Sequence, residues 1–161
     1  MVTFQEVELR EVMRRWVTGV AILTSGSREV RHGMTVSSLT SISVQPPLVA
    51  ITMSNSTRTK HLVDETEFFA INLLSEGQQA LADRFAGRMS DSEDRFHDLQ
   101  IFYGECGAPM LTEAAAWLEC KVVHKYEMPE TTLYVGEVLN AHKAEDRPPL
   151  VYFNRDYHRI V

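Results

Sequence analysis

A run of hydroxyl side chains is the first chemical signal in this sequence. Residues 33–48 read GMTVSSLTSISVQPPL and alternate as a β-strand does. A strand that only filled a core would carry Val, Ile or Leu at its inward positions. The hydroxyl-bearing residues of the run are Thr35, Ser37, Ser38, Thr40, Ser41 and Ser43. Hydroxyls and backbone N–H groups gathered in one strand and the loop after it suit a polar ligand that carries phosphate.

A second polar segment, SNSTRTK, follows at residues 54–60. Ser56 or Thr57 can cap a helix that runs to about Glu65, and the free N–H groups of a helix start attract anions. Four hydroxyls and two cations also lie in the segment. One interpretation is an N-cap on a surface helix. The other is a phosphate site that the first segment completes, because the two segments flank a short apolar strand at 48–53.

Motifs for other chemistries do not occur in the sequence. The six histidines form no HxH or HxxxH pair, and neither GxSxG, GxGxxG nor GxxxxGK[ST] is present. We therefore predict no metal site, and a Ser/His/Asp triad stays open only because its members need not be neighbours in sequence. Cys106 and Cys120 are predicted to be reduced structural thiols, since two cysteines at this spacing make no disulfide framework.

Composition is that of an ordinary globular protein. The 161 residues, 44% of them hydrophobic, predict one domain over 1–161. A net charge of −6 and the absence of a basic tract argue against nucleic-acid binding. No apolar run reaches the ~20 residues needed to span a bilayer. The N-terminal segment lacks the apolar core of a signal peptide, so we expect a cytoplasmic protein.

The periodicity predicts mainly strands with a few short helices. Pro46-Pro47 should interrupt the strand ladder, Ser75 and Gln78 fit a capping box, and 89–96 reads as a polar surface loop. Predicted strands are 17–25, 30–44, 48–53, 68–74, 114–126, 133–142 and 150–153, and predicted helices are 4–16, 57–65 and 75–87. This pattern favours a closed or nearly closed antiparallel barrel.

Several stretches together resemble the flavin reductase family, from about Met13 to Tyr157. They read MRRWVTGVAILT, GMTVSSLTSISVQPPLVAI, STRTKHLV, FAINLL, SEGQQALADRFAG, LYVGEV and PLVYF. The family comprises the reductase components of two-component flavin-dependent monooxygenases. The resemblance implies an FMN-binding split β-barrel of antiparallel Greek-key type, and a homodimer with FMN or FAD near the subunit interface. It also implies NAD(P)H:flavin oxidoreductase activity with NADH or NADPH as co-substrate, and a partner monooxygenase that receives the reduced flavin.

The resemblance also implies which residues contact the flavin. They are Met34, Thr35, Val36, Ser37, Ser38, Met53, Ser54, Asn55, Ser56, Thr57, Lys60, Phe85, Ala86 and Gly87, with Thr57 and Lys60 on the phosphate side. Backbone N–H groups at 35–38 would bond the ring edge and stabilise charge that develops there. Hydride passes directly between the two cofactors, so no catalytic side chain is implied. A plain structural role stays open for Val36, Phe85, Ser38 and Gly87.

One position departs from the family pattern. Thr131 stands where many members carry the histidine of an Asp-His-Thr triplet near the flavin and nicotinamide. Threonine donates one hydrogen bond but cannot become cationic. His158, near the C-terminus, is a candidate to replace the missing histidine from elsewhere in the chain. Two alternatives therefore stay open: a flavin-binding split-barrel protein without reductase turnover, and a flavin-dependent enzyme that acts directly on its own substrate.

Overall fold

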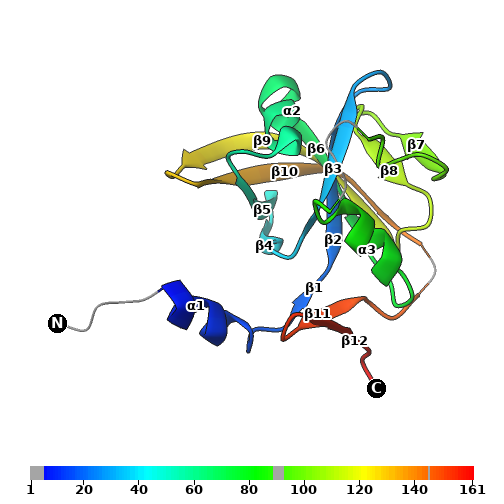
Figure 1. The fold of residues 1–161 in the computed structure, drawn as a ribbon. Helices are drawn as coiled ribbons and strands as arrows, with labels where there is room; N and C mark the ends of the chain where they lie inside the picture. The colour runs from blue at the N-terminus through cyan, green and yellow to red at the C-terminus, as the bar shows by residue number, and fades with distance from the viewer. Residues whose placement is uncertain (1–5, 89–92, 145) are drawn as a thin grey trace.

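The computed structural model describes residues 6–88, 93–144 and 146–161, which form three antiparallel sheets and three helices (Figure 1). The largest sheet has seven strands in the order β3-β2-β6-β9-β10-β5-β4. Its strands are β2 (Ala21–Gly26), β3 (Arg31–Val36), β4 (Thr40–Val44), β5 (Pro47–Ser54), β6 (Phe68–Leu73), β9 (Ala116–Glu127) and β10 (Thr131–Lys143). The mainly β, antiparallel architecture is as predicted from the sequence.

Two small sheets and the helices complete the fold. One small sheet has the order β1-β11-β12 and the other pairs β7 with β8. Their bounds are β1 (Thr18–Gly19), β11 (Val151–Phe153), β12 (Asp156–His158), β7 (Ile101–Tyr103) and β8 (Pro109–Leu111); the helices are α1 (Glu6–Met13), α2 (Arg58–Thr66) and α3 (Gln79–Phe85). In Figure 1, α1 stands away from the seven-stranded sheet. Within the described residues, no helix has both the length and the apolar character that crossing a membrane requires.

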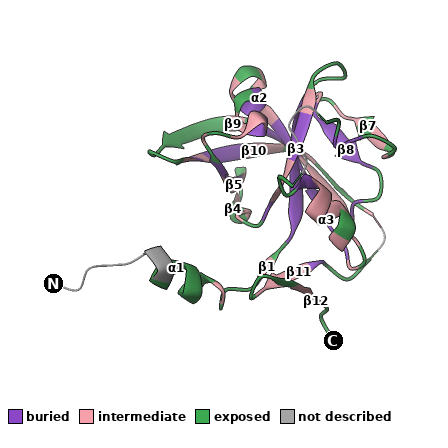
Figure 2. Ribbon diagram, in the orientation of Figure 1, coloured by how far each residue is buried: buried purple, intermediate pink, exposed green. Residues whose placement is uncertain are grey.

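Strand β2 is buried along its whole length because it separates two hydrophobic clusters (Figure 2). Ala21 and Leu23 point into one cluster, and Ile22 points into the other. Adjacent residues of a strand face opposite sides of a sheet, so a strand with both faces covered has no face exposed to solvent. The first cluster fills the inside of the curled sheet, and the second lies between the sheet and α3.

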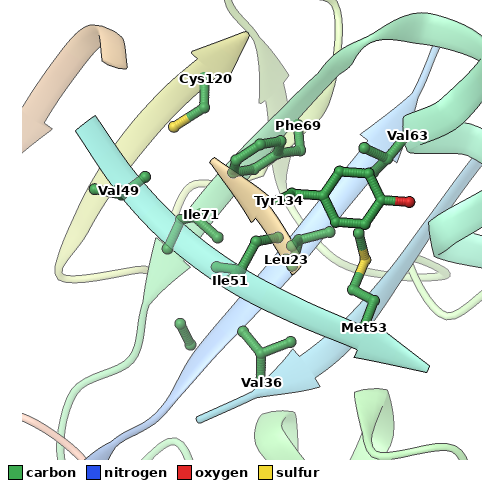
Figure 3. Close-up of a cluster of buried hydrophobic side chains, with 11 residues drawn as sticks. Leu23, Val36, Val49, Ile51, Met53, Val63, Phe69, Ile71, Cys120 and Tyr134 are labelled. Atoms are coloured by element: carbon green, nitrogen blue, oxygen red, sulfur yellow. The ribbon is translucent and has the colours of Figure 1, made fainter. Parts of the chain in front are cut away.

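The first cluster is drawn in Figure 3 and centres on Tyr134 of β10. The side chain of Tyr134 is buried among Leu23, Met53 and Val63, which come from β2, β5 and α2. Its hydroxyl reaches out of the cluster and donates a 2.8 Å hydrogen bond to Asp64 Oδ1. A buried phenol needs such a partner, and this bond ties α2 over the end of the curled sheet.

The two edge strands of the large sheet, β3 and β4, are consecutive in the chain and are joined by residues 37–39. Here Ser38 leaves the ladder, and its hydroxyl bonds the backbone of Thr52 in β5. Ser38 Oγ lies 3.2 Å from the Thr52 carbonyl oxygen and accepts from the Thr52 N–H at 3.1 Å. One side chain thus takes the place of a strand partner, which is the structural role left open for Ser38.

Several element boundaries differ from the prediction for clear physical reasons. The predicted strand 30–44 is two strands, because residues 37–39 leave the ladder. Strand β5 already begins at Pro47, opposite Val44, and a proline is tolerated at the first position of a strand. The third helix begins at Gln79 rather than at residue 75, since Gly77 has a φ of 90° that no helix accommodates.

The Ser75–Gln78 contact forms without opening a helix. Gln78 Oε1 accepts from the Ser75 N–H at 2.8 Å and closes a turn ahead of α3. At the other end of the chain, the first helix stops at Met13, and its predicted start at residue 4 lies outside the described residues. The short strands β7, β8 and β12 were not predicted.

Candidate functional site

Cavities follow β3 from one end of the strand to the other. We name four of them by their linings. The apolar cavity (about 760 Å³) and the tyrosine cavity (about 230 Å³) are both lined by Val36. Next comes the histidine cavity (about 300 Å³), which is lined by Met34 and His32. Last is the arginine cavity (about 260 Å³), lined by Arg31. Consecutive residues of one strand therefore line consecutive cavities.

Shared residues join these cavities into one track. Val36 and Ser37 line both the apolar and the tyrosine cavity. Thr35 and Ala86 line both the tyrosine and the histidine cavity. Arg58 lines both the histidine and the arginine cavity. A long ligand that followed β3 would pass from an apolar end to a charged end.

The histidine cavity forms where β3 meets the start of α2 and the end of α3. Gly33 allows this close approach: a Cβ atom added there would lie 3.0 Å from the ring of Phe85. Thr35 then fastens α3 to the strand, because its hydroxyl donates a 2.5 Å hydrogen bond to the carbonyl oxygen of Ala82. The cavity wall is therefore built from β3 and the ends of two helices, together with the loop residues next to those ends.

Four lining residues of the histidine cavity were not among the predicted contacts: His32, Arg58, Thr59 and Arg95. Arg95 lies in the stretch predicted to be a polar surface loop, yet it is only 4% exposed. Its guanidinium donates to the carbonyl oxygens of Gly33 at 3.0 Å and Phe85 at 3.3 Å. His32 is equally buried, and its Nδ1 lies 2.8 Å from Thr59 Oγ1. Residues 89–92 of the predicted loop lie outside the described residues.

Most of the predicted flavin contacts meet along this track. Seven of them line the histidine cavity: Met34, Thr35, Ser56, Thr57, Phe85, Ala86 and Gly87. Three line the apolar cavity: Val36, Ser37 and Ser38. The remaining five, which are not among the lining residues of the four cavities, are Met53, Ser54, Asn55, Lys60 and Thr131.

Asn55 and Lys60 are engaged in bonds within the protein. The Asn55 amide donates to the carbonyl oxygen of Met128 at 2.8 Å, and its Oδ1 accepts from the Thr132 hydroxyl at 2.6 Å. Lys60 Nζ forms a 2.7 Å ion pair with Asp64. These contacts fix the loop before α2 to the turn between β9 and β10, and they direct Lys60 along its own helix. The cation of this segment that lines the histidine cavity is Arg58.

Asp64 is the centre of a polar cluster behind the site. It accepts from Lys60, from Lys125 Nζ at 2.9 Å and from the Tyr134 hydroxyl. Partial burial acts to raise the pKa of this carboxyl, but the three hydrogen bonds outweigh it and hold the pKa below its ordinary value. Burial and the hydrogen bond to Asp64 raise the pKa of Tyr134. This cluster holds α2 in place and does not line the cavities.

Thr131 and His158 lie apart from the cavities. Thr131 opens β10 directly opposite Ser54 of β5, beside the loop that leads into α2. His158 is exposed, and its Nε2 lies 3.1 Å from the carbonyl oxygen of Phe153. Thr131 thus lies beside the predicted phosphate loop, on the strand next to β5. His158 lies on the sheet of β1, β11 and β12.

The cysteines are two free thiols. Burial raises the pKa of Cys106 to about 11 and that of Cys120 to about 12, so both are protonated at neutral pH. Among the described residues, no group of three or more His, Cys, Asp or Glu side chains is arranged to hold a metal ion. The chemistry of this site therefore depends on what the cavities along β3 bind.

Known proteins are similar to this chain in sequence and in fold. The reductase component of 4-hydroxyphenylacetate 3-monooxygenase from Thermus thermophilus is 31% identical over 152 residues, which cover 94% of this chain and 95% of the relative. The NADH:FMN oxidoreductase of Rhodococcus qingshengii is 31% identical over 157 residues, with 94% and 80% covered. The solved NADH:FAD oxidoreductase SgcE6 of Streptomyces globisporus superposes with a TM-score of 0.92 at 31% identity, covering 100% of this chain and 97% of that one.

The family model of the flavin reductase like domain matches residues 13–161. This match extends from the end of α1 to the last residue, so it includes all four cavities along β3 and every predicted contact residue. The chain belongs to the flavin reductase family.

Proposed function

We propose that this protein is an NAD(P)H-dependent flavin reductase, which transfers hydride from NADH or NADPH to FMN or FAD. We further propose that the reduced flavin serves a partner monooxygenase, as the names of relatives state for those proteins. The observation that carries the proposal is the track of cavities along β3, which changes from an apolar lining to one that contains arginines. Flavin nucleotides have the same polarity: a flat, largely apolar ring at one end and phosphate at the other.

The residues of the track fit such a ligand. Trp16, Leu39 and Tyr152 line the apolar cavity and offer flat or aliphatic surface to a ring. Residues 37–39 lie outside the strand ladders, so their backbone N–H groups can bond a ring edge. Ser56 and Thr57 line the histidine cavity at the positive end of α2. Arg58 and the buried Arg95 add positive charge there.

The protein contributes position and electrostatics rather than acid–base chemistry. A bound flavin supplies a ring that accepts hydride, and the side chains need only orient it and exclude water. Phe85, fully buried against Gly33, gives the track a rigid middle. The N–H groups at 37–39 stabilise negative charge on the ring edge without having to move, because the neighbouring strands hold them.

We also propose a homodimer, in which a second copy covers α1 and the apolar cavity. Apolar side chains on and after α1 are open to solvent, with Trp16 68% exposed. They are Leu9, Val12, Met13, Trp16 and Val17. A helix of eight residues is not stable alone in water, so an apolar partner surface is needed. Light scattering of wild-type protein and Trp16→Ala tests this: we expect a dimer that the variant weakens, and a monomeric wild type at micromolar concentration would contradict it.

We make two further proposals, which concern the domain organisation and the cellular location of the chain. We propose that residues 1–161 form one flavin reductase-like domain, supported by the family match over 13–161. We propose a cytoplasmic location, supported by the two free thiols, Cys106 and Cys120, since a reducing compartment keeps thiols in this state.

The test of function is NADH oxidation by purified protein, followed by absorbance with and without added FMN or FAD. We expect oxidation that depends on flavin. Flavin binding without NADH oxidation would favour a non-reductase flavoprotein, and Thr131→His is then the first variant to make, because a histidine stands there in many family members. Product formed from an organic substrate without a partner oxygenase would favour an enzyme that acts on its own substrate.

A further inference from the structure

The arginine cavity lies beyond the part of the track that a flavin mononucleotide needs. Arg58 forms a wall common to this cavity and to the histidine cavity. A ligand whose phosphate lies against Ser56, Thr57 and Arg58 therefore has a further cavity of about 260 Å³ directly beyond that phosphate. This cavity is lined by Arg28, Glu29, Val30, Arg31, Arg58, Glu93 and Asp94.

Two of the three arginines of this cavity, Arg28 and Arg31, contact the same aromatic residue. Tyr103 of β7 lies under the guanidinium of Arg28, at 4.5 Å from its carbon to the ring centre. The Tyr103 hydroxyl also accepts a 2.9 Å hydrogen bond from Arg31 Nη1. The turn that carries Arg28 is itself closed by a 2.7 Å bond from the Ser27 N–H to the Val30 carbonyl oxygen. Both arginines are thus positioned before any ligand arrives.

The carboxylates of the cavity complement the cations. Asp94 accepts from Arg31 Nη2 at 2.9 Å, and this ion pair leaves the lining with further acceptors at Glu29 and Glu93. Phosphate suits the cationic wall at Arg58, whereas ribose hydroxyls and an adenine amino group are donors that suit carboxylates. A planar base also stacks well on an arginine such as Arg28.

We propose that the arginine cavity binds the adenosine diphosphate part of a dinucleotide, with Arg58 at the phosphates and Arg28 at the adenosine. The proposal rests on the proposed function, because it places the flavin phosphate in the histidine cavity. Two ligands of a flavin reductase carry this group, FAD and NAD(P)H. Continuity of the cavities through Arg58 favours FAD, so the protein binds FAD more tightly than FMN.

The experiment compares dissociation constants for FAD, FMN, NADH and free ADP, measured by calorimetry and flavin fluorescence. The variants are Arg28→Ala, the charge-conserving Arg28→Lys and, as a matched control, Arg147→Ala, which removes an exposed arginine that lines none of these four cavities. We expect Arg28→Ala to weaken FAD and ADP binding about tenfold and to leave FMN binding unchanged. Arg28→Lys should recover part of the affinity, and Arg147→Ala should match the wild type.

The outcomes distinguish FAD from NADH as the ligand whose adenosine diphosphate group occupies the cavity. They also distinguish failure of this proposal from failure of the proposed function. Weaker FAD binding with unchanged NADH binding assigns the cavity to the flavin. Weaker NADH binding with both flavins unchanged assigns it to the nicotinamide dinucleotide. Unchanged binding of FAD, NADH and ADP in Arg28→Ala overturns the proposal. If the wild type binds neither FMN nor FAD, the proposed function itself fails, whatever Arg28 does.

Discussion

The two ends of β3 face cavities whose linings differ in chemical character. At the Val36 end, the strand faces a large cavity lined by Trp16, Leu39 and Tyr152. At the Arg31 end, five residues earlier in the sequence, it faces a small cavity lined by arginines and carboxylates. The cavity lining along this single strand thus changes from apolar to charged. Such a change orients a ligand that is itself apolar at one end and anionic at the other.

Substitutions that disturb the packing at the middle of β3 should have the largest effect, because the middle of the strand connects the apolar and the charged cavities. Phe85→Ala removes a fully buried ring that packs on Gly33 and Phe96. We expect the free energy of unfolding to fall by about 3–5 kcal/mol, as for other buried Phe→Ala changes. Urea unfolding measures this, with the half-exposed Phe102→Ala as a control that should cost much less. A loss below that of the control would mean that Phe85 does not support the track.

The charged end is tested by exchanging cations on α2. Arg58 lines the histidine cavity, whereas Lys60 is paired with Asp64. We therefore expect Arg58→Met to weaken FMN binding by about 1.5 kcal/mol, or roughly tenfold, and Lys60→Met to leave it unchanged. Titration of FMN against both variants decides this. A larger loss in Lys60→Met would instead support Lys60 as the phosphate ligand, which the resemblance implies.

The apolar end depends on Ser38, which joins the segment after β3 to β5. Ser38→Ala removes both hydrogen bonds to the Thr52 backbone and leaves those groups without this partner. We expect the free energy of unfolding to fall by about 1–2 kcal/mol. The exposed Ser41→Ala, on the next strand, should change it by less than about 0.5 kcal/mol. Equal losses in the two variants would show that the Ser38 bridge contributes nothing.

The Asp64 cluster lies outside the track and should affect stability alone. The pKa of Asp64 in the folded protein is below its ordinary value, so its contribution is present above the unfolded pKa of about 4 and is lost as pH falls through the folded pKa. We expect the stability difference between wild type and Asp64→Asn to shrink below about pH 4. Urea unfolding from neutral pH to pH 3 measures it. A difference that is constant with pH, or weaker FMN binding at neutral pH, would contradict this separation.

Sequence reasoning identified the elements of the site better than it identified their boundaries. The hydroxyl run and the RFAG stretch meet in the histidine cavity, because Thr35 and Phe85 are brought together across β3 and α3. Thr35 carries a local signal, a hydroxyl in a strand, whereas Phe85 was implied by the resemblance to the flavin reductase family. Such signals survive in a single sequence.

Neither the burial of Arg95, which was missed, nor the pairing of Lys60, which was predicted to contact phosphate, carries a local signal. Arg95 stands in a polar, acidic stretch that reads as exposed, and only the packing of Phe96 against Phe85 draws it inside. Lys60 reads as a free cation, and only the fold brings Lys125 and Tyr134 to the same carboxylate of Asp64. Burial and pairing of charged groups depend on contacts between distant segments, which periodicity and composition do not record.

The central claim is that a flavin lies along β3 with its phosphate in the histidine cavity. A crystal structure of the protein with FMN tests it most directly. The account predicts phosphate oxygens within hydrogen-bond distance of Ser56, Thr57 or Arg58, and the ring against Val36 and residues 37–39. A phosphate bound at the Val36 end, or a flavin bound away from β3, would contradict it.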